Sequence, residues 1–230
     1  MRTLLNPRIR AILAIVCLMA CAVRAGWAAP VLTNGSFELP TLSAGTYQYL
    51  TGLNNGWVYS DAGVLTAQGC TPWYYSSPPT GYSGAQYALL QGGSATNTQA
   101  YITQTFTATT AGVYSITWVD AGRPANGSAM GNQTYNVDLN ATVLGSYSTT
   151  SGQQFTAHTL SNVDLLAGTS YTFGFYGTNL AGGDNTAFLD NVSFNYVTAL
   201  PEANAASLLL LCGGIAALST IRRRTRLHEI

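Results

Sequence analysis

Short runs in which apolar and polar residues alternate recur along the middle of the chain, and clusters of turn-forming residues separate them. In one run Tyr114, Ile116 and Trp118 fall on one side of an extended strand, and the hydroxyl residues between them fall on the other. A period of two with aromatic and β-branched residues is typical of antiparallel strands that bury one side. The clearest runs are 85–91, 100–108, 112–120, 134–140, 170–177 and 186–197.

The same part of the chain shows no sustained helical periodicity. We therefore predict one all-β domain over residues 29–198, built as a two-sheet antiparallel β-sandwich of the jelly-roll kind. A domain of about 170 residues buries roughly 70% of its unfolded surface, which is enough for a hydrophobic core. Residues 67–84 are too rich in Pro, Gly and Ser for a central strand and are predicted to form a long loop.

The charges are distributed unevenly, although the formal net charge is zero. Eight of the nine basic residues, all of them arginines, lie in the two terminal segments, and Arg123 is the only cation between residues 30 and 198. The same range contains seven carboxylates, so its net charge is negative. A nucleic-acid-binding protein needs a basic face to neutralise phosphates, so this composition excludes nucleic acid as a partner.

The cysteines predict no internal disulfide. Cys17 and Cys21 lie in the N-terminal segment and Cys212 in the C-terminal segment, which leaves Cys70 alone in the predicted domain. We expect Cys70 to be a buried apolar side chain.

The N-terminal segment has the three parts of a secretory signal peptide. An apolar run over residues 11–22 follows a positive region, and Gly26 and Ala28 are the small residues that a cut after Ala28 requires. The positive region contains Arg2, Arg8 and Arg10. We predict a signal peptide over residues 1–28 and export of the chain; the alternatives are an uncleaved anchor helix and lipidation at Cys21.

The C-terminal segment, residues 199–230, is predicted to contain a transmembrane helix. Residues 205–221 are almost wholly apolar and would span roughly 25 Å as a helix. The cluster that follows consists of Arg222, Arg223, Arg224 and Arg226. Such a cluster keeps the C-terminus on the cytoplasmic side of the inner membrane, with the domain outside.

Pro201 and Glu202, followed by a short apolar span and an arginine cluster over residues 222–226, resemble the PEP-CTERM sorting signal of Gram-negative bacteria. Ala203 stands where the family motif has its second proline. The resemblance implies a partner of the exosortase type, which would cut the tail near Pro201 and Glu202 and release the domain to the surface or the medium. The alternative is a single-pass membrane protein that keeps its tail.

A second resemblance covers most of the domain and rests on short motifs in a fixed order. The motifs lie at 34–38, 56–57, 87–90, 102–106, 111–114 and 189–192. Together they resemble the galactose-binding-like jelly rolls of carbohydrate-binding modules, in particular the DUF642-like and choice-of-anchor domains of exported bacterial proteins. The resemblance implies that the two ends of the domain, at Glu38 and Asp190, lie side by side.

That implied contact suggests a metal site. Ca²⁺ prefers oxygen ligands and mixes carboxylates with backbone carbonyls. We hypothesise a structural Ca²⁺ held by Glu38, Asp190 and a backbone carbonyl near Gly35. In the alternative interpretation the two carboxylates accept hydrogen bonds from backbone amides of turns.

The predicted loop carries aromatic residues that could bind a glycan. Trp73, Tyr74, Tyr75 and Tyr82 would offer flat faces on which sugar rings stack, while nearby amides bind the hydroxyl groups. In the alternative interpretation these rings pin the loop onto the domain. Trp57, in a separate Gly-Trp pair, is expected in the core.

The domain shows no catalytic motif. His158 is its only histidine, so a multi-histidine metal site is excluded, and neither a Gly-x-Ser-x-Gly elbow nor a His-Glu-x-x-His helix is present. Asp184 and Asp190 are the one pair of acids considered for glycoside hydrolysis. We expect a non-catalytic, surface- or matrix-associated protein that binds extracellular polysaccharide; the alternatives are a structural protein without a discrete ligand and a secreted glycan-active enzyme.

Overall fold

The structure is a computed structural model of the 230-residue chain, and it describes residues 31–70, 73, 78–92, 99–124, 133–181 and 185–200. One compact unit spans Ala28–Ala199. The predicted signal peptide and all of the predicted tail beyond Leu200 lie outside the described residues. Within the described ranges no helix is long and apolar enough to cross a membrane.

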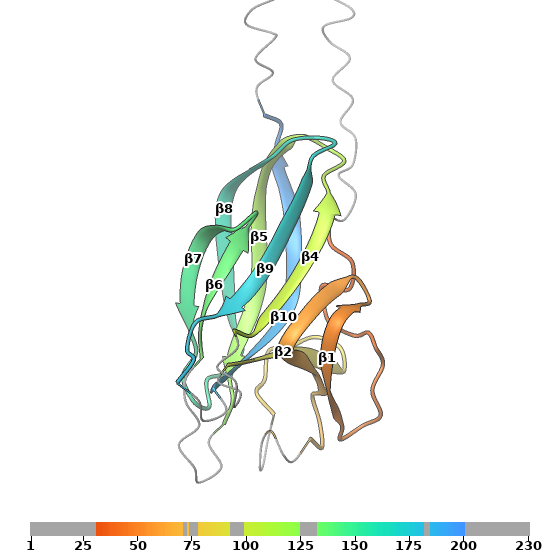
Figure 1. Ribbon diagram of the computed structural model, residues 1–230, viewed down its shortest axis with the longest axis vertical. Helices are drawn as coiled ribbons and strands as arrows, with labels where there is room; N and C mark the ends of the chain where they lie inside the picture. Colours follow the sequence, from red (N-terminus) through yellow and green to blue (C-terminus); the bar gives the residue numbers. More distant parts are fainter. Residues whose placement is uncertain are drawn as a thin grey trace, which may run out of the picture. The chain divides into compact units, whose positions relative to one another are not determined.

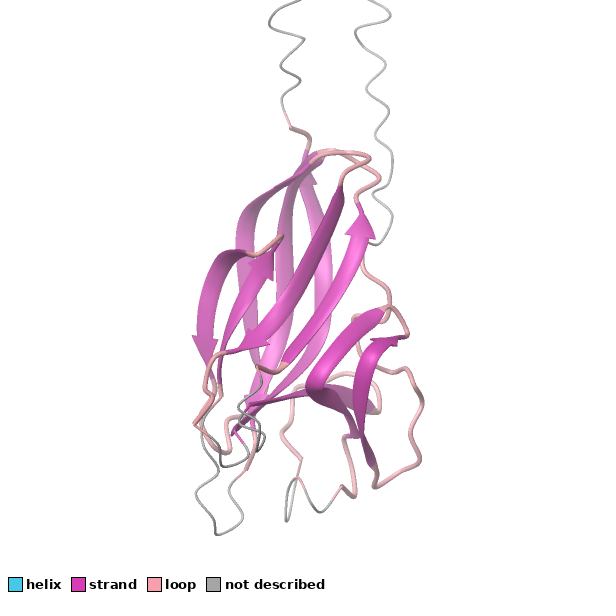
Figure 2. Cartoon of the chain, in the orientation of Figure 1, coloured by secondary structure: helices cyan, strands magenta, loops and turns pink. Residues whose placement is uncertain are grey.

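The described part of the chain is built from β-strands and loops, and it contains no helix (Figure 2). The strands are β1 (Tyr47–Asn54), β2 (Trp57–Thr66), β3 (Gln86–Gly92), β4 (Tyr101–Thr107), β5 (Gly112–Gly122), β6 (Thr134–Leu139), β7 (Thr142–Ser148), β8 (Thr156–Leu165), β9 (Ser170–Gly177) and β10 (Asn185–Thr198) (Figure 1).

All of these strands pair antiparallel in one sheet with the order β7-β6-β9-β4-β2-β3-β10-β5-β8, and β1 adds to β2. In Figure 1 the layer of β4, β6, β7 and β9 lies in front of the layer that contains β5, β8 and β10. Strand β2 joins the two layers, because residues 58–60 pair with β4 and residues 62–66 pair with β3. Asp61, at the change of partner, has a left-handed φ of 45°. The predicted all-β antiparallel fold is thus present, but the two layers are parts of one continuous sheet rather than the two separate sheets that were predicted, because β2 pairs with both layers.

The main hydrophobic core fills the space between the layers. Trp57, Ile116, Phe173 and Phe175 are among its buried residues, and Trp118 is also buried there. This confirms the alternation predicted for residues 112–120 and the core position predicted for Trp57. Because every described strand pairing and both hydrophobic clusters lie inside Ala28–Ala199, this unit folds on its own core.

A second cluster covers the opposite face of β2, β3, β10 and β5. Its buried residues are Leu65, Ala67, Cys70, Trp73, Tyr87, Leu89, Ala121 and Phe188. Register explains the two faces: Val64 pairs with Ala88 in the main core, whereas the next pair, Leu65 with Tyr87, belongs to the second cluster. The predicted burial of Cys70 is confirmed.

All six predicted strand runs are strands in the structure, and the described residues of 67–84 contain no strand, as predicted. Four strands were missed. In β2 five consecutive residues, 62–66, are buried because both faces are covered, so alternation is lost. Strands β1, β7 and β8 lie at edges of the sheet and are mostly exposed, so their apolar pattern is weak.

Candidate functional site

The two ends of the domain meet at Gly35. Its carbonyl accepts a hydrogen bond from the Val192 amide of β10 at 2.8 Å. Residues 33–40 form a closed turn rather than a strand, because the side chain of Asn34 bonds both the amide and the carbonyl of Leu39. The indole of Trp57 donates to the Asn34 carbonyl at 2.9 Å, which ties this turn to the core. The predicted contact between the ends of the domain is therefore observed.

Glu38 and Asp190 both bind backbone amides of residues 83–86. Oδ2 of Asp190 accepts the Ser83 amide at 2.8 Å, and Oε1 of Glu38 accepts the amides of Ala85 and Gln86, each at 3.1 Å. Oδ1 of Asp190 accepts the amide of Asn191 at 2.7 Å. The two carboxylates thus hold the start of β3 from both ends of the domain.

Two glycines allow this close arrangement. A side chain on Gly84 would meet Oε1 of Glu38 at 2.2 Å, and Gly84 also has a left-handed φ of 71°. A side chain on Gly35 would meet the Val192 carbonyl at 2.2 Å. A side chain on Gly35 would meet the backbone of β10 and push the ends of the domain apart, whereas a side chain on Gly84 would force the Glu38 carboxylate to move.

The hydrogen bonds of Glu38 and Asp190 are those of the alternative interpretation, in which the carboxylates bind backbone amides. Each carboxylate oxygen accepts at least one amide, and the Gly35 carbonyl accepts the Val192 amide. Amide hydrogens that point at the same oxygens compete with a cation. No group of three or more His, Cys, Asp or Glu side chains gathers anywhere in the described ranges. Bound Ca²⁺ stays a prediction.

Burial gives Asp190 an unusual titration. It raises the pKa of the carboxyl from 3.8 to about 7; the amides of Ser83 and Asn191 lower it, and the negative charge of Glu38 raises it further. Asp190 therefore binds a proton at a much higher pH than an ordinary aspartate does.

The predicted aromatic loop is only partly described, since Tyr74 and Tyr75 lie outside the described residues. Trp73 is 3% exposed: its ring packs edge-on against Phe188, and the Arg123 guanidinium lies 4.3 Å from the ring centroid. Tyr82 is half-buried and packs against Tyr87 at 5.6 Å between ring centroids. These contacts match the packing interpretation of Trp73 and Tyr82, and glycan binding by this loop stays a prediction.

Exposed aromatic rings lie beside Trp73, on strand β1. Tyr47 and Tyr49 are 42% and 49% exposed, and their ring centroids are 5.9 Å apart. Their centroids lie 5.4 and 6.1 Å from that of Trp73, and the Tyr49 hydroxyl donates to the side-chain carbonyl of Gln91 on β3. We call Tyr47, Tyr49, Trp73 and Gln91 the tyrosine surface.

Sequence reasoning missed the tyrosine surface because β1 was not recognised as a strand. The signal that could have found it is the Tyr-Gln-Tyr spacing at residues 47–49, which places two rings on one face of an extended strand.

A buried polar network lies between β5, β6 and β8. The fully buried carboxylate of Asp120 accepts hydrogen bonds from the Tyr135 hydroxyl at 2.7 Å, from Nε2 of Gln153 at 2.9 Å and from Nε2 of His158 at 2.8 Å. The His158 ring stacks on Trp118 with centroids 5.2 Å apart. Sequence analysis singled out His158 but found no partner for it, because Asp120 is distant along the chain. Asp184, the proposed partner of Asp190 in hydrolysis, lies outside the described residues.

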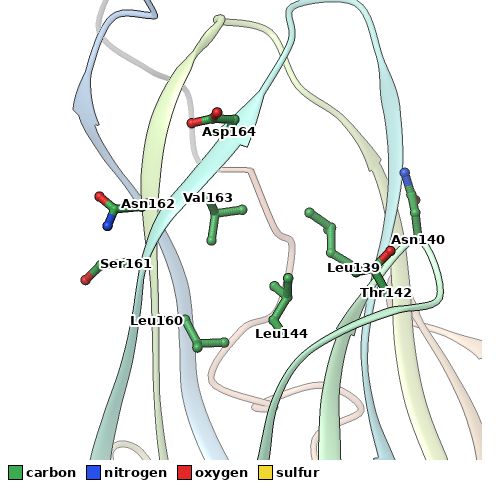
Figure 3. Close-up of a pocket in the computed structure, with 9 residues that line it drawn as sticks. All are labelled: Leu139, Asn140, Thr142, Leu144, Leu160, Ser161, Asn162, Val163 and Asp164. Atoms are coloured by element: carbon green, nitrogen blue, oxygen red, sulfur yellow. The ribbon is translucent and has the colours of Figure 1, made fainter.

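A pocket of about 430 Å³ opens between the two end strands of the sheet, β7 and β8. In Figure 3 the aliphatic side chains Leu160 and Val163 of β8 point across the gap toward Leu139 and Leu144 of the β6–β7 hairpin. The remaining lining residues are Asn140, Thr142, Ser161, Asn162 and Asp164.

No protein-family model matches the sequence, and no curated protein matches it. Solved structures with a similar fold include a cyclase from Fischerella sp. TAU in complex with 4-(1H-indol-3-yl)butan-2-one. It has 18% sequence identity and a TM-score of 0.53, over 76% of this chain and 100% of the cyclase chain. At this identity the likeness supports the fold alone.

Carbohydrate-binding modules are also among the structures that this chain is similar to. The module TmCBM61, in complex with β-1,4-galactotriose, has 13% identity and a TM-score of 0.47, over 74% of this chain and 100% of its own. The CBM22-1 xylan-binding domain of Paenibacillus barcinonensis Xyn10C has 14% identity and a TM-score of 0.44, over 76% of this chain and 99% of its own. Both TM-scores are below 0.5, so the likeness to the cyclase is the one that supports the fold.

Proposed function

We propose that this chain is an exported, non-catalytic protein whose β-domain binds extracellular polysaccharide at the tyrosine surface. The observation that carries the proposal is the pair of half-exposed rings, Tyr47 and Tyr49, side by side on one strand. Rings left this exposed to water recover apolar burial when a sugar ring stacks on them. The amide of Gln91 and the tyrosine hydroxyls can bind the hydroxyl groups of the same sugar.

The charges of the domain favour a neutral polymer. Arg123 is its only cation and is buried against Trp73, whereas seven carboxylates lie in the same part of the sequence. An acidic polysaccharide would meet net repulsion without a basic partner. We therefore expect the domain to bind neutral glycans in preference to acidic ones.

Export and sorting are part of this proposal and rest on the two terminal segments. Residues 1–28 would direct the chain across the inner membrane, and residues 199–230 would hold it there until an exosortase-type partner cuts near Pro201 and Glu202. Mass spectrometry of the extracellular fraction tests this part. A C-terminus near Leu200 is expected; a chain with its intact arginine tail in the membrane fraction would contradict the sorting step.

The binding test uses affinity electrophoresis of unit Ala28–Ala199 through gels that contain neutral polysaccharides such as xylan, galactan or mannan. At least one polymer should retard the unit, and Tyr47→Ala and Tyr49→Ala should each weaken binding about tenfold, the loss of one stacking contact. Tyr196→Ala is the matched control, because Tyr196 is 39% exposed but lies on β10. Equal binding by all three variants would exclude the tyrosine surface.

A purely structural surface protein is the competing function. This function predicts that no polymer, neutral or acidic, retards the unit in the gel, although its circular dichroism spectrum shows that it is folded.

A further inference from the structure

Each of the two strands beside the pocket, β7 and β8, contains an irregularity. In β7 the register with β6 shifts between Val137 and Asp138, which leaves Leu144 as an extra residue. In β8 the register with β5 shifts between Tyr114 and Ile116. Such β-bulges bend a strand and leave a residue unpaired, and they are frequent at sheet edges and beside binding sites.

The β8 bulge consists of Ser161 and Asn162, and Asn162 has a left-handed φ of 61°. Both bulges contribute lining residues to the same pocket. Two bulged end strands that face each other form a gap that hydrogen bonding between β7 and β8 does not close.

The interior of the pocket is aliphatic. Leu139, Leu144 and Leu160 pack against the main core but are only partly buried, and Val163 is 8% exposed. In Figure 3 these four side chains converge on the gap, whereas Asn162 and Ser161 point away from it. Apolar surface that remains in contact with water is a source of binding free energy for an apolar ligand that covers it.

The lining of the pocket also includes polar residues. Thr142 lines the pocket at the start of β7, and a bulge of the kind in β8 leaves backbone groups outside the regular pairing. Asp164 is the one ionisable residue of the lining, and the lining holds no cation. An anionic head group would therefore be disfavoured, and a neutral hydroxylated head group would find hydrogen-bonding partners.

We propose that this pocket is a second binding site, for a neutral amphiphile whose short alkyl chain lies among Leu139, Leu144, Leu160 and Val163 and whose hydroxylated head lies at the mouth beside Thr142. The volume of about 430 Å³ is within the range of small-molecule sites. The site is independent of the tyrosine surface, which is built on β1 and β3.

The test is isothermal titration of unit Ala28–Ala199 with hexyl β-D-glucoside, which carries both parts of the ligand. Methyl β-D-glucoside supplies the head alone, and hexyl sulfate supplies the chain with an anionic head. We expect saturable binding of hexyl glucoside, at least tenfold weaker binding of hexyl sulfate, and no measurable binding of methyl glucoside. Absence of saturable binding by hexyl glucoside, or equal binding of hexyl sulfate, would overturn the proposal.

Two tryptophan substitutions locate the site. Thr142→Trp places a large ring at the mouth and should reduce the affinity for hexyl glucoside at least tenfold. Val143→Trp is the matched control, since Val143 is the next residue of the same strand, is 50% exposed and does not line the pocket. Thermal unfolding of both variants checks that they fold. Unchanged affinity in folded Thr142→Trp would place the ligand elsewhere and refute the assignment.

Discussion

Glu38 and Asp190 hold the same turn although they lie at opposite ends of the domain. Asp190 accepts the Ser83 amide at 2.8 Å, and Glu38 accepts the Ala85 amide at 3.1 Å. The negative charge of Glu38 raises the pKa of Asp190, and the two carboxylates share the amides of one short segment, which offsets part of their repulsion. The first turn, the loop before β3 and the last strand are thereby joined.

A side chain on Gly84 would displace the Glu38 carboxylate from the amides that it accepts. Gly84→Ala is expected to lower the free energy of unfolding by about 3 kcal/mol, because the new methyl group combines a left-handed φ with a clash against Glu38. Gly52→Ala is the control, with a similar φ of 69° and no atom within 4 Å of the added carbon, and should cost about 1 kcal/mol. Urea unfolding measures both. Equal losses would mean that contact with Glu38 contributes nothing.

Asp190 should make stability depend on pH. Its pKa in the folded protein, about 7, is above the ordinary value of 3.8, so the folded state binds the proton more tightly than the unfolded state. The stabilising contribution of this proton is complete below about pH 4 and is lost as the pH rises through 7.

Asp190→Asn removes that titration. The difference in unfolding free energy between the native protein and the variant should therefore change from pH 4 to pH 8, in the direction that disfavours the native protein at high pH. Urea unfolding at several pH values gives the difference directly. A constant difference across this range would show that Asp190 titrates normally.

Removing Ca²⁺ with a chelator, or adding it, tests whether the domain binds this metal. Because the oxygens of Glu38 and Asp190 already accept amides, we expect EDTA and added CaCl₂ to leave the melting temperature of unit Ala28–Ala199 unchanged within about 1 °C. Differential scanning calorimetry of a sample dialysed against each solution measures this. A rise with CaCl₂ that Glu38→Gln abolishes would instead establish the metal site.

The network around Asp120 should contribute strongly to stability. Asp120→Asn replaces one acceptor oxygen by an amide that donates, so a donor among Tyr135, Gln153 and His158 loses its partner inside the protein. We expect a loss of about 3 kcal/mol in unfolding free energy. The control is Asp164→Asn on the exposed side of β8, which should change stability by less than about 0.5 kcal/mol. A loss as small as that of the control would mean that water satisfies the freed donor.

Several parts of the fold follow from local sequence. The alternation around Tyr114 and Tyr171 predicts buried strand faces, because side-chain direction in a strand depends only on position along it. The burial of Cys70 was predicted from the apolar character of a free thiol, and that of Trp57 from its Gly-Trp pair in the resemblance to known jelly rolls. The resemblance to known jelly rolls predicted that the two ends of the domain, at Glu38 and Asp190, lie side by side, and the hydrogen bond from the Val192 amide to the Gly35 carbonyl joins those ends.

The candidate sites depend on contacts that no local pattern specifies. Tyr49 reaches Gln91 because β1, β2 and β3 are neighbours in the sheet, and His158 meets Asp120 because β8 pairs with β5. Strand order is a property of the whole chain, since it is decided by which arrangement buries the most apolar surface in both layers.

The sequence by itself determined the strand class of this protein, the buried side of its clearest strands and the acidic charge balance of its domain. Only the tertiary structure decided that Trp73 packs inside while Tyr47 and Tyr49 stay exposed, and that the ends of the sheet leave a pocket between Leu144 and Leu160. The physical reason is that local conformation depends on neighbouring residues, whereas exposure depends on what the distant parts of the chain cover.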